Sequence, residues 1–256
     1  MNRSSLLIVT YHALGARASR VVVPPRRLEH DLLAVRDAGY AFVSLDQIAD
    51  WIAGRRPLPA PAAAVTFDDG YASVATSALP VLQRLHVRAT VFVLAGRLGG
   101  DNQWPGQPRG VPSMPLLDSA GLRGLAAAGV AIASHSASHA RLPALDDDAA
   151  RTEVIESADR LEDVLQVPVR HFAYPYGERG PREIELARQR YDTAASADAR
   201  LVAGGGDPHD LPRIDAHDLH VAVRLRLLDP ARLVPYLAAR RSLRRLREAA
   251  SRASGS

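Results

Sequence analysis

Two adjacent carboxylates, Asp68 and Asp69, stand in the segment TFDDG at residues 66–70, directly after the apolar run 63–65. In parallel α/β proteins the active site lies at the carboxyl ends of the strands. Neighbouring side chains on a strand point to opposite faces, so both acids can serve one site only if the chain turns there, and Gly70 permits that turn. A helix N-cap or an Asx turn would explain the same residues without chemistry.

Two histidines, His135 and His139, follow a second apolar run at residues 130–133. If this segment turns helically, the two rings share one face and suit a single cation. Two solvated loop histidines are the alternative. Combined with the acid pair, the histidines predict a site with one carboxylate and two imidazoles as ligands, and one carboxylate left over as a base. Three protein ligands leave positions open for water and substrate, as in catalytic metal sites.

A third segment, FAYPYG at residues 172–177, also follows a predicted strand. Its rings and its Pro-Tyr-Gly turn can form a groove wall and direct a backbone N–H into the groove. Ordinary packing and turn formation are the alternative.

Short apolar runs alternate with segments of helical period, which is the pattern of repeated βα units. We expect strands at 6–11, 41–44, 63–67, 89–94, 130–134, 171–174, 193–197 and 213–216, and helices at 28–38, 45–53, 73–85, 118–128, 146–165 and 181–189. Seven or eight units suggest a barrel, although a doubly wound open sheet has the same alternation. The irregular stretch 96–117 is long enough to predict a functional loop, with a solvated insertion as the alternative.

The composition is that of an ordinary globular chain of 256 residues, 47% hydrophobic and 23% charged. Disorder, collagen and a coiled coil are thereby excluded, and one domain is expected at this length. The absence of cysteine excludes disulfides, a thiolate nucleophile and a Cys-ligated zinc site, so any metal must be held by histidine and carboxylate. All 32 basic residues are arginine and give a net charge of +4. This usage is typical of a GC-rich coding bias, because the charges are scattered except at the C-terminus.

Taken together, TFDDG, then HSASH at 135–139, then YPYG at 174–177 resemble the motifs of the polysaccharide deacetylases of carbohydrate esterase family 4, over about residues 6–215. The opening VTYH at 9–12, the YPYG form and LPRI at 211–214 look like the branch with the biofilm poly-N-acetylglucosamine deacetylases. The resemblance implies an α/β fold with a distorted (β/α)7–8 barrel. It also implies a metal-dependent hydrolase that removes N-acetyl groups from amino sugars.

The resemblance also implies roles for individual residues. Asp69, His135 and His139 would be the metal ligands, Asp68 the general base, and Tyr176 the donor of a backbone N–H to the oxyanion. One carboxylate and two imidazoles suit zinc, our first expectation, and also cobalt, nickel, manganese or iron.

The general acid that protonates the departing amine has two candidates. His12 matches the branch in which the acid comes first, and His217 matches the typical family order; we expect His12. The family places an arginine at the start of the third motif to pair with the base, but here that position is Ala173. Arg213 is the nearest substitute, since a guanidinium can hold a carboxylate bidentately, with a surface salt bridge as the alternative. We take the remaining histidines as ordinary surface or core residues, namely His30, His86, His171, His209 and His220.

Further expectations concern substrate, domains and location. Trp104 in the long loop either stacks on a sugar ring or is a hydrophobic plug that fixes the loop. Residues 1–230 form the predicted catalytic domain, and 231–256 a basic helix and tail. That arginine-rich helix either contacts anionic lipid, or a lipid-phosphate-linked sugar, or is simply solvated. No motif indicates nucleic-acid binding. Without a signal peptide or membrane span in the sequence given, a cytoplasmic protein is expected.

Two other functions fit the same motifs. A deacylase of a non-sugar amide would keep the site and change the substrate. A catalytically silent carbohydrate-binding module would keep the fold and lose the base or a ligand, yet Asp68, Asp69, His135 and His139 are all present.

Overall fold

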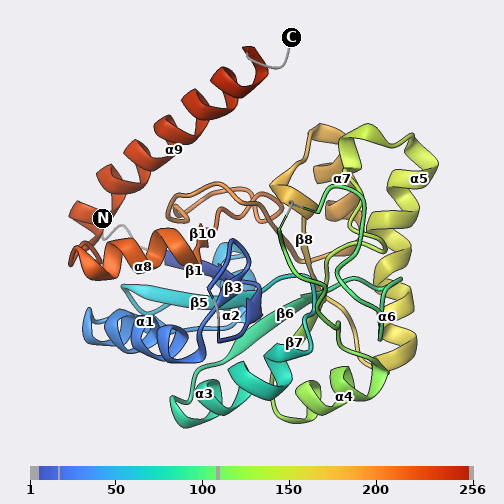
Figure 1. The fold of residues 1–256 in the computed structure, drawn as a ribbon, viewed down its shortest axis with the longest axis horizontal. Helices are drawn as coiled ribbons and strands as arrows, with labels where there is room; N and C mark the ends of the chain where they lie inside the picture. Colours follow the sequence, from blue (N-terminus) through green and yellow to red (C-terminus); the bar gives the residue numbers. More distant parts are fainter. Residues whose placement is uncertain (1–5, 17, 108–109, 254–256) are drawn as a thin grey trace.

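A curled parallel sheet forms the centre of the molecule (Figure 1). The computed structural model describes residues 6–16, 18–107 and 110–253. The strand order is β10-β1-β5-β6-β7-β8-β9, with β4 beside the start of β5, and every pairing is parallel. The predicted α/β class and barrel are confirmed.

The strands are β1 (Leu6–Tyr11), β2 (Ala13–Leu14), β3 (Val22–Val23), β4 (Ala41–Phe42), β5 (Ala62–Phe67), β6 (Ala89–Val93), β7 (Ala131–Ser134), β8 (His171–Ala173), β9 (Thr193–Ala195) and β10 (Ile214–Asp215). The α-helices are α1 (Pro25–Asp37), α2 (Leu45–Ile52), α3 (Leu79–Arg84), α4 (Ser119–Ala127), α5 (Asp147–Arg151), α6 (Ser157–Leu165), α7 (Pro181–Arg190), α8 (Ala216–Arg224) and α9 (Pro230–Ala253). Short 3₁₀ turns cover Leu142–Ala144 and Pro175–Gly177, and π-helical segments cover Val74–Ala78 and Thr152–Glu156.

The ring of strands is distorted where its two edges meet. Between β9 and the β10 edge, the described chain makes one parallel bridge, from Ala195 to Leu211. The strand β10 itself is only two residues long and pairs with β1. The sheet therefore curls into a barrel with a weak seam.

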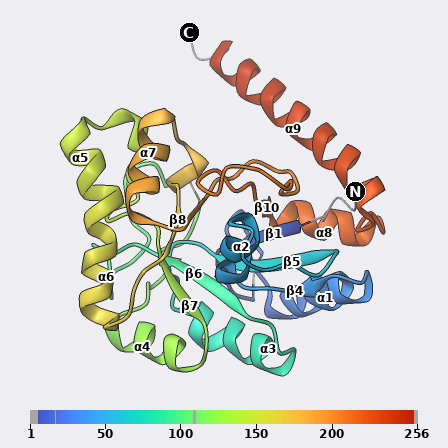
Figure 2. The same ribbon diagram turned by 180° about the vertical axis from the view of Figure 1, so that it is seen from behind.

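Both faces of the sheet are buried, as the continuous apolar runs predict for parallel strands. In β1, Leu7 and Val9 pack in the large cluster shared with the helices, whereas Leu6 and Ile8 pack inside with small alanines and Phe92. Helix α2 contributes Leu45 and Ile48 to this inner cluster and lies in front of β1 and β5 in Figure 2. A rigid, apolar barrel thus supports the strand ends.

The sequence did not predict the short β2–β3 pair or α8, and two predicted helices are interrupted by the π-helical segments. Residues 1–5, 17, 108–109 of the long loop and 254–256 of the tail lie outside the described residues.

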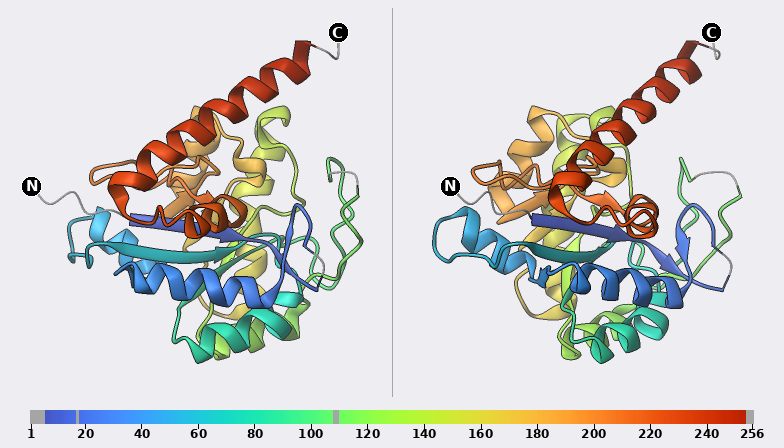
Figure 3. Two further views of the ribbon diagram at one scale, coloured as in Figure 1. Left: turned by 60° about the vertical axis from the view of Figure 1, so that its left-hand side comes forward. Right: turned by 90° about the vertical axis from the view of Figure 1, so that its left-hand side faces the viewer.

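Helix α9 begins at Pro230, packs Leu233 and Leu237 into the core, and then projects away from the body (Figure 3). The domain boundary at 230/231 stays a prediction. None of the helices in the described part of the chain combines the length and the apolar character that a bilayer crossing requires.

Candidate active site

The carboxyl ends of the strands open into a groove of about 1110 Å³. Its lining brings together every predicted site residue, from four strand ends, two loops and the first turn of α8 (Ala216–Arg224): His12, Asp68, Asp69, Trp104, His135, His139, Tyr176, Arg213 and His217. Segments far apart in the sequence therefore meet at the edge of the sheet where α/β enzymes place their chemistry.

The chain turns at the acid pair, as predicted. Asp69 adopts φ +69° and Gly70 φ +72°, so the strand ends and both carboxylates face the groove. Aspartate tolerates the left-handed region better than most residues do, because its short polar side chain can hydrogen-bond locally. The N-cap alternative is wrong, since neither carboxylate caps a helix and both line the groove.

The histidine segment is not helical, so the helical turn that would place both rings on one face does not form. Ser136 and His139 have φ of +71° and +68°, and the His139 N–H donates to Ser136 Oγ at 3.1 Å. The backbone N–H groups of Ala137 and Ser138 donate to Glu153 Oε2 at 3.0 and 2.9 Å. These contacts hold an irregular turn that brings both rings to one point without a helix.

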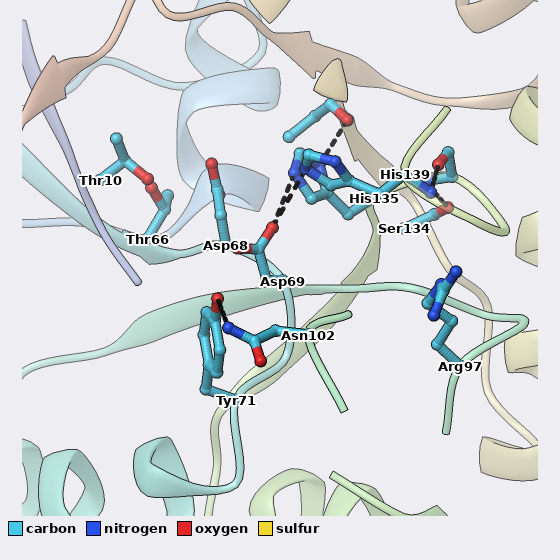
Figure 4. Close-up of polar contacts among 12 residues, drawn as sticks. Thr10, Thr66, Asp68, Asp69, Tyr71, Arg97, Asn102, Ser134, His135 and His139 are labelled. Carbon is cyan, nitrogen blue, oxygen red and sulfur yellow. Dashed lines mark hydrogen bonds and ion pairs between the residues drawn. The ribbon is translucent and has the colours of Figure 1, made fainter. Parts of the chain in front are cut away.

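Asp69, His135 and His139 form the cluster with metal-ligand character (Figure 4). Asp69 Oδ1 lies 3.4 Å from His135 Nε2 and 3.3 Å from His139 Nε2, and all three side chains are buried. His135 Nδ1 lies 2.8 Å from the Ala173 carbonyl, which as an acceptor requires the proton on Nδ1 and leaves Nε2 with a lone pair toward Asp69.

These residues fit a divalent cation. Asp69 Oδ1 is buried and has no hydrogen-bond partner among the described residues. A lone pair on His135 Nε2 facing a carboxylate oxygen is unfavourable unless a proton or a metal cation lies between them. One carboxylate and two imidazole nitrogens are a donor set typical of zinc and its first-row neighbours.

The electrostatics of the two acids keep both ionised. Burial by itself would raise the pKa of Asp69, but the rings of His135 and His139 and the nearby His12 hold it well below its ordinary value. Burial likewise opposes ionisation of Asp68, but the charge and hydrogen bonds of Arg213, together with the charges of His135 and His12, outweigh burial and lower the pKa of that carboxyl.

The pKa values of the two imidazoles are shifted in opposite directions. Burial lowers the pKa of His139, which keeps that ring neutral and able to act as a ligand. Burial also disfavours the charged form of His135, but the charge of Asp68 and the contact with Asp69 outweigh burial and raise its pKa. A cation among these groups would oppose protonation of both rings.

Arg213 holds Asp68 through two parallel hydrogen bonds, Nη1 to Oδ1 at 2.7 Å and Nη2 to Oδ2 at 2.8 Å. The guanidinium is buried; its Nε donates to the Ser196 carbonyl at 3.0 Å, and Nη1 lies 3.3 Å from both Thr10 and Thr66 Oγ1. The surface salt bridge that the sequence left open is wrong. The bidentate grip fixes the carboxylate plane and favours its charged form.

Both candidate acids line the groove. The half-buried His12 ring follows β1 and has no hydrogen-bond partner among the described residues. His217 lies in the first turn of α8, with its Nδ1 3.4 Å from Arg27 Nη1. Because a guanidinium only donates, the Nδ1 atom of His217 accepts in this contact. Both histidines therefore lie where an acid could act, and the expectation that His12 is the acid stays a prediction.

Tyr176 and Trp104 enclose His139. Their rings lie 4.4 and 4.7 Å from the imidazole, and Tyr176 adopts φ +59° in the Pro175–Gly177 turn. The Tyr176 hydroxyl donates to Pro105 O at 3.3 Å, which ties the YPYG turn to the long loop. Trp104 is only 5% exposed, so its burial favours the plug over a free stacking platform.

Several supporting residues carried no signal in the sequence. Glu153, which holds the histidine turn, lies inside a predicted helix, and Arg27, which contacts His217, lies at the start of α1. Asn102 anchors the long loop: it donates to Tyr71 Oη at 3.3 Å (Figure 4), and it accepts from the Met114 N–H at 2.8 Å. Such partners are distant in sequence and become recognisable only in three dimensions.

A family model for polysaccharide deacetylases matches residues 55–192. The chain belongs to this family. The match contains the acid pair, the histidine pair and the YPYG turn, all of which contribute to the lining of the groove. The predicted membership of carbohydrate esterase family 4 is confirmed, and with it a relationship to carbohydrate de-N-acetylases.

Individual relatives are distant. The protein YxkH of Bacillus subtilis (strain 168), named for polysaccharide deacetylases, is 22% identical over 186 residues, which are 73% of this chain and 62% of YxkH. The poly-β-1,6-N-acetyl-D-glucosamine N-deacetylase of Escherichia coli (strain K12) is 47% identical over 49 residues, 19% of this chain and 7% of that protein. This deacetylase-family chain thus spans less than two thirds of either relative.

Among solved structures, IcaB from Ammonifex degensii superposes with a TM-score of 0.73 at 24% identity, over 86% of this chain and 97% of that one. At this identity the likeness shows the fold. The curled parallel barrel is therefore the family's architecture.

Proposed function

We propose that this protein is a metal-dependent hydrolase that removes an N-acetyl group from an amino sugar in a polysaccharide, glycolipid or glycoconjugate precursor. The observation that carries the proposal is the buried Asp68–Arg213 pair beside the ligand cluster of Asp69, His135 and His139. It supplies a carboxylate held ionised next to a cation site, which is what hydrolysis of an amide by an activated water requires.

Asp69 Oδ1 and the Nε2 atoms of His135 and His139 would hold the cation. When bound, a divalent ion supplies a Lewis acid that polarises the acetyl carbonyl and makes water more acidic. Asp68 accepts the proton of the attacking water, while Arg213 keeps the carboxylate oriented.

The remaining steps concern the oxyanion and the leaving group. The backbone N–H of Tyr176 is proposed to donate to the oxyanion, since the turn of Pro175–Gly177 places this residue in the groove wall. His12 would deliver a proton to the departing nitrogen. Without that proton the tetrahedral intermediate expels water instead of the amine.

The substrate follows from the groove and the relatives. The groove is wide enough for a sugar unit and has polar and aromatic walls. A named relative acts on poly-β-1,6-N-acetyl-D-glucosamine, which supports an N-acetylated amino sugar here. We propose zinc as the metal, with cobalt, nickel, manganese and iron as other ions that the same ligands accept.

The test is acetate release from chitooligosaccharides, from poly-β-1,6-N-acetylglucosamine oligomers and from a UDP-linked N-acetylamino sugar. Wild type and Asp68→Asn are compared after chelation and after metal re-addition. We expect release that needs metal and that Asp68→Asn abolishes, while that variant still binds the metal.

Two other outcomes would replace the proposal. Release from a non-sugar acetamide but from no sugar would identify a small-amide deacylase. No release from any substrate, together with sugar binding by the metal-loaded protein, would identify a catalytically silent binding module.

A further inference from the structure

We propose a second divalent-cation site, formed by His30, Asp31 and His220 on the outer face of the barrel. His30 and Asp31 lie on α1, and His220 lies on α8, the helix that packs against it (Figure 3). None of the three residues lines the groove, so this site is separate from the proposed active site. The inference is independent of the proposed function.

The three side chains converge on one point. Asp31 Oδ1 lies 2.9 Å from His220 Nδ1 and 3.4 Å from His30 Nδ1, and the three potential ligand atoms lie within 4.8 Å of one another. The two imidazole rings are 6.3 Å apart and nearly perpendicular, at 67°. Small rotations of the two rings would place three donors around one ion, with further positions open to water.

Asp31 forms an ion pair with Arg27, but within the described chain one of its buried carboxylate oxygens lacks a hydrogen bond. Its side chain is fully buried, and Oδ2 has no hydrogen-bond partner among the described residues. The Nε atom of Arg27 is 3.8 Å from Oδ2, beyond hydrogen-bond distance, and is also without a partner. A buried carboxylate is costly unless it is both paired and hydrogen-bonded. A cation held with the two imidazoles would give the carboxylate a closer positive partner than Arg27 does.

The site is open to ions from solvent on its histidine side. The His30 side chain is 61% exposed and that of His220 25% exposed, whereas Asp31 is 0% exposed. Such a gradient, with a buried anion behind accessible neutral ligands, admits an ion without unfolding either helix. One carboxylate and two imidazoles select Zn²⁺, Ni²⁺ or Co²⁺ over Mg²⁺ or Ca²⁺.

The experiment counts zinc sites in the tag-free full-length protein. After chelation and dialysis, each variant is titrated with Zn²⁺ by calorimetry, and bound zinc is measured by mass spectrometry after gel filtration. His135→Asn disables the groove site, and His220→Asn disables the second site. In each, the asparagine amide can keep the hydrogen bond that the ring Nδ1 makes, to Ala173 O or to Asp31, while the metal-binding geometry is lost.

We expect two zinc ions per wild-type chain, one in each single variant and none in the double variant. His86→Asn removes an exposed histidine outside both clusters and should keep two. Zinc should raise the melting temperature of His135→Asn but not that of the double variant. If folded His135→Asn binds no zinc, the proposed second site does not exist. If the double variant still binds zinc, the ion is held by other residues, which also overturns the proposal. Failure of the deacetylase assay would leave this count unchanged.

Discussion

Asp68 and Arg213 lie 145 residues apart in the chain and form two parallel hydrogen bonds beside the ligand cluster. The pair joins the end of β5 to the segment that leads into β10, across the strand β1 between them. The same contact therefore orients the proposed base and links β10, which lies next to the weak seam of the barrel, to β5.

Arg213→Lys tests the electrostatic part of this relationship. Lysine keeps the charge but loses the bidentate geometry, so the pKa of Asp68, which Arg213 lowers against the effect of burial, should rise. A base with a higher pKa becomes protonated at a higher pH. The acid limb of the kcat/KM profile should therefore move upward, and kcat should fall about tenfold to a hundredfold, as loss of a charged hydrogen bond of about 1.5–3 kcal/mol implies.

Arg190→Lys is the matched control, because Arg190 pairs with the carboxylate of Glu162 outside the groove. Its pH profile should match that of the wild type. An unchanged acid limb in Arg213→Lys would show that Arg213 holds the barrel seam without tuning the base.

Substrates with different leaving groups can show whether His12 or His217 is the general acid. We expect His12→Gln to reduce amide hydrolysis by about 10²- to 10⁴-fold, the usual contribution of a general acid. The same variant should hydrolyse 4-nitrophenyl acetate almost as fast as wild type, because nitrophenolate leaves without a proton. His217→Asn should affect both substrates alike and more weakly. If His217→Asn instead shows the selective loss, the assignment of the two histidines is reversed.

Some elements and site residues could be predicted from the sequence, and others could not. The limits of β1 match the prediction, since all six residues of this largely apolar run are buried. The strands β2 and β3 were not predicted, because two-residue strands are defined by their mutual pairing and too short to show a periodic pattern. Asp69, His135 and His139 were identified by residue type and by position after strands, and the cluster exists, although no helix forms it.

What the sequence could not supply was the pairing of distant polar groups. For Arg213 the sequence allowed either a bidentate pair with Asp68 or a surface salt bridge. The structure decides between them, because Arg213 is only 2% exposed. Residues 135–139 form no helical turn, because Ser136 and Glu153 accept hydrogen bonds from the backbone N–H groups there. The His30, Asp31 and His220 cluster joins two helices that the sequence separates by most of the chain.

Removal of metal should destabilise the protein, since an ion that binds only the folded state stabilises it by mass action. At a free metal concentration of 100 times Kd, the gain is about 2.7 kcal/mol, which corresponds to a rise of about 5–11 °C in Tm at this size. Measured in the His220→Asn background, this rise reports the groove site alone. Asp69→Asn in the same background should show no rise. An equal rise with Asp69→Asn would remove Asp69 from the ligand set.

Gly177 in the YPYG turn should tolerate no side chain. It has φ +71°, and a Cβ there would lie 2.6 Å from Ala197 Cβ and 2.7 Å from the Ala197 backbone nitrogen. We expect Gly177→Ala to cost about 1–3 kcal/mol of stability and to displace the neighbouring Tyr176 N–H. Gly39→Ala is the control, because Gly39 has φ +88° but nothing within 4 Å of its Cβ position. Chemical denaturation should show the smaller loss for Gly39→Ala, about 1 kcal/mol.

The basic C-terminal helix provides a prediction about membranes. From Arg240 onward the sequence holds six arginines against the single acid Glu248, and the helix projects from the body (Figure 3). Exposed Val234 and Leu243, at 53% and 50%, add apolar surface along the same helix. If this helix contacts anionic lipid, each arginine near the surface contributes about 1 kcal/mol.

We therefore expect the full chain to sediment with phosphatidylglycerol vesicles at low salt and not with phosphatidylcholine vesicles. Replacing three arginines by glutamine, at positions 244, 245 and 247, should weaken binding on the order of a hundredfold. The control replaces Arg55, Arg56 and Arg84, exposed arginines outside α9, and carries the same change in net charge. Equal weakening by both triple variants would mean that total charge, and not the helix, governs binding. No sedimentation of wild type at low salt would mean that α9 is a solvated surface helix.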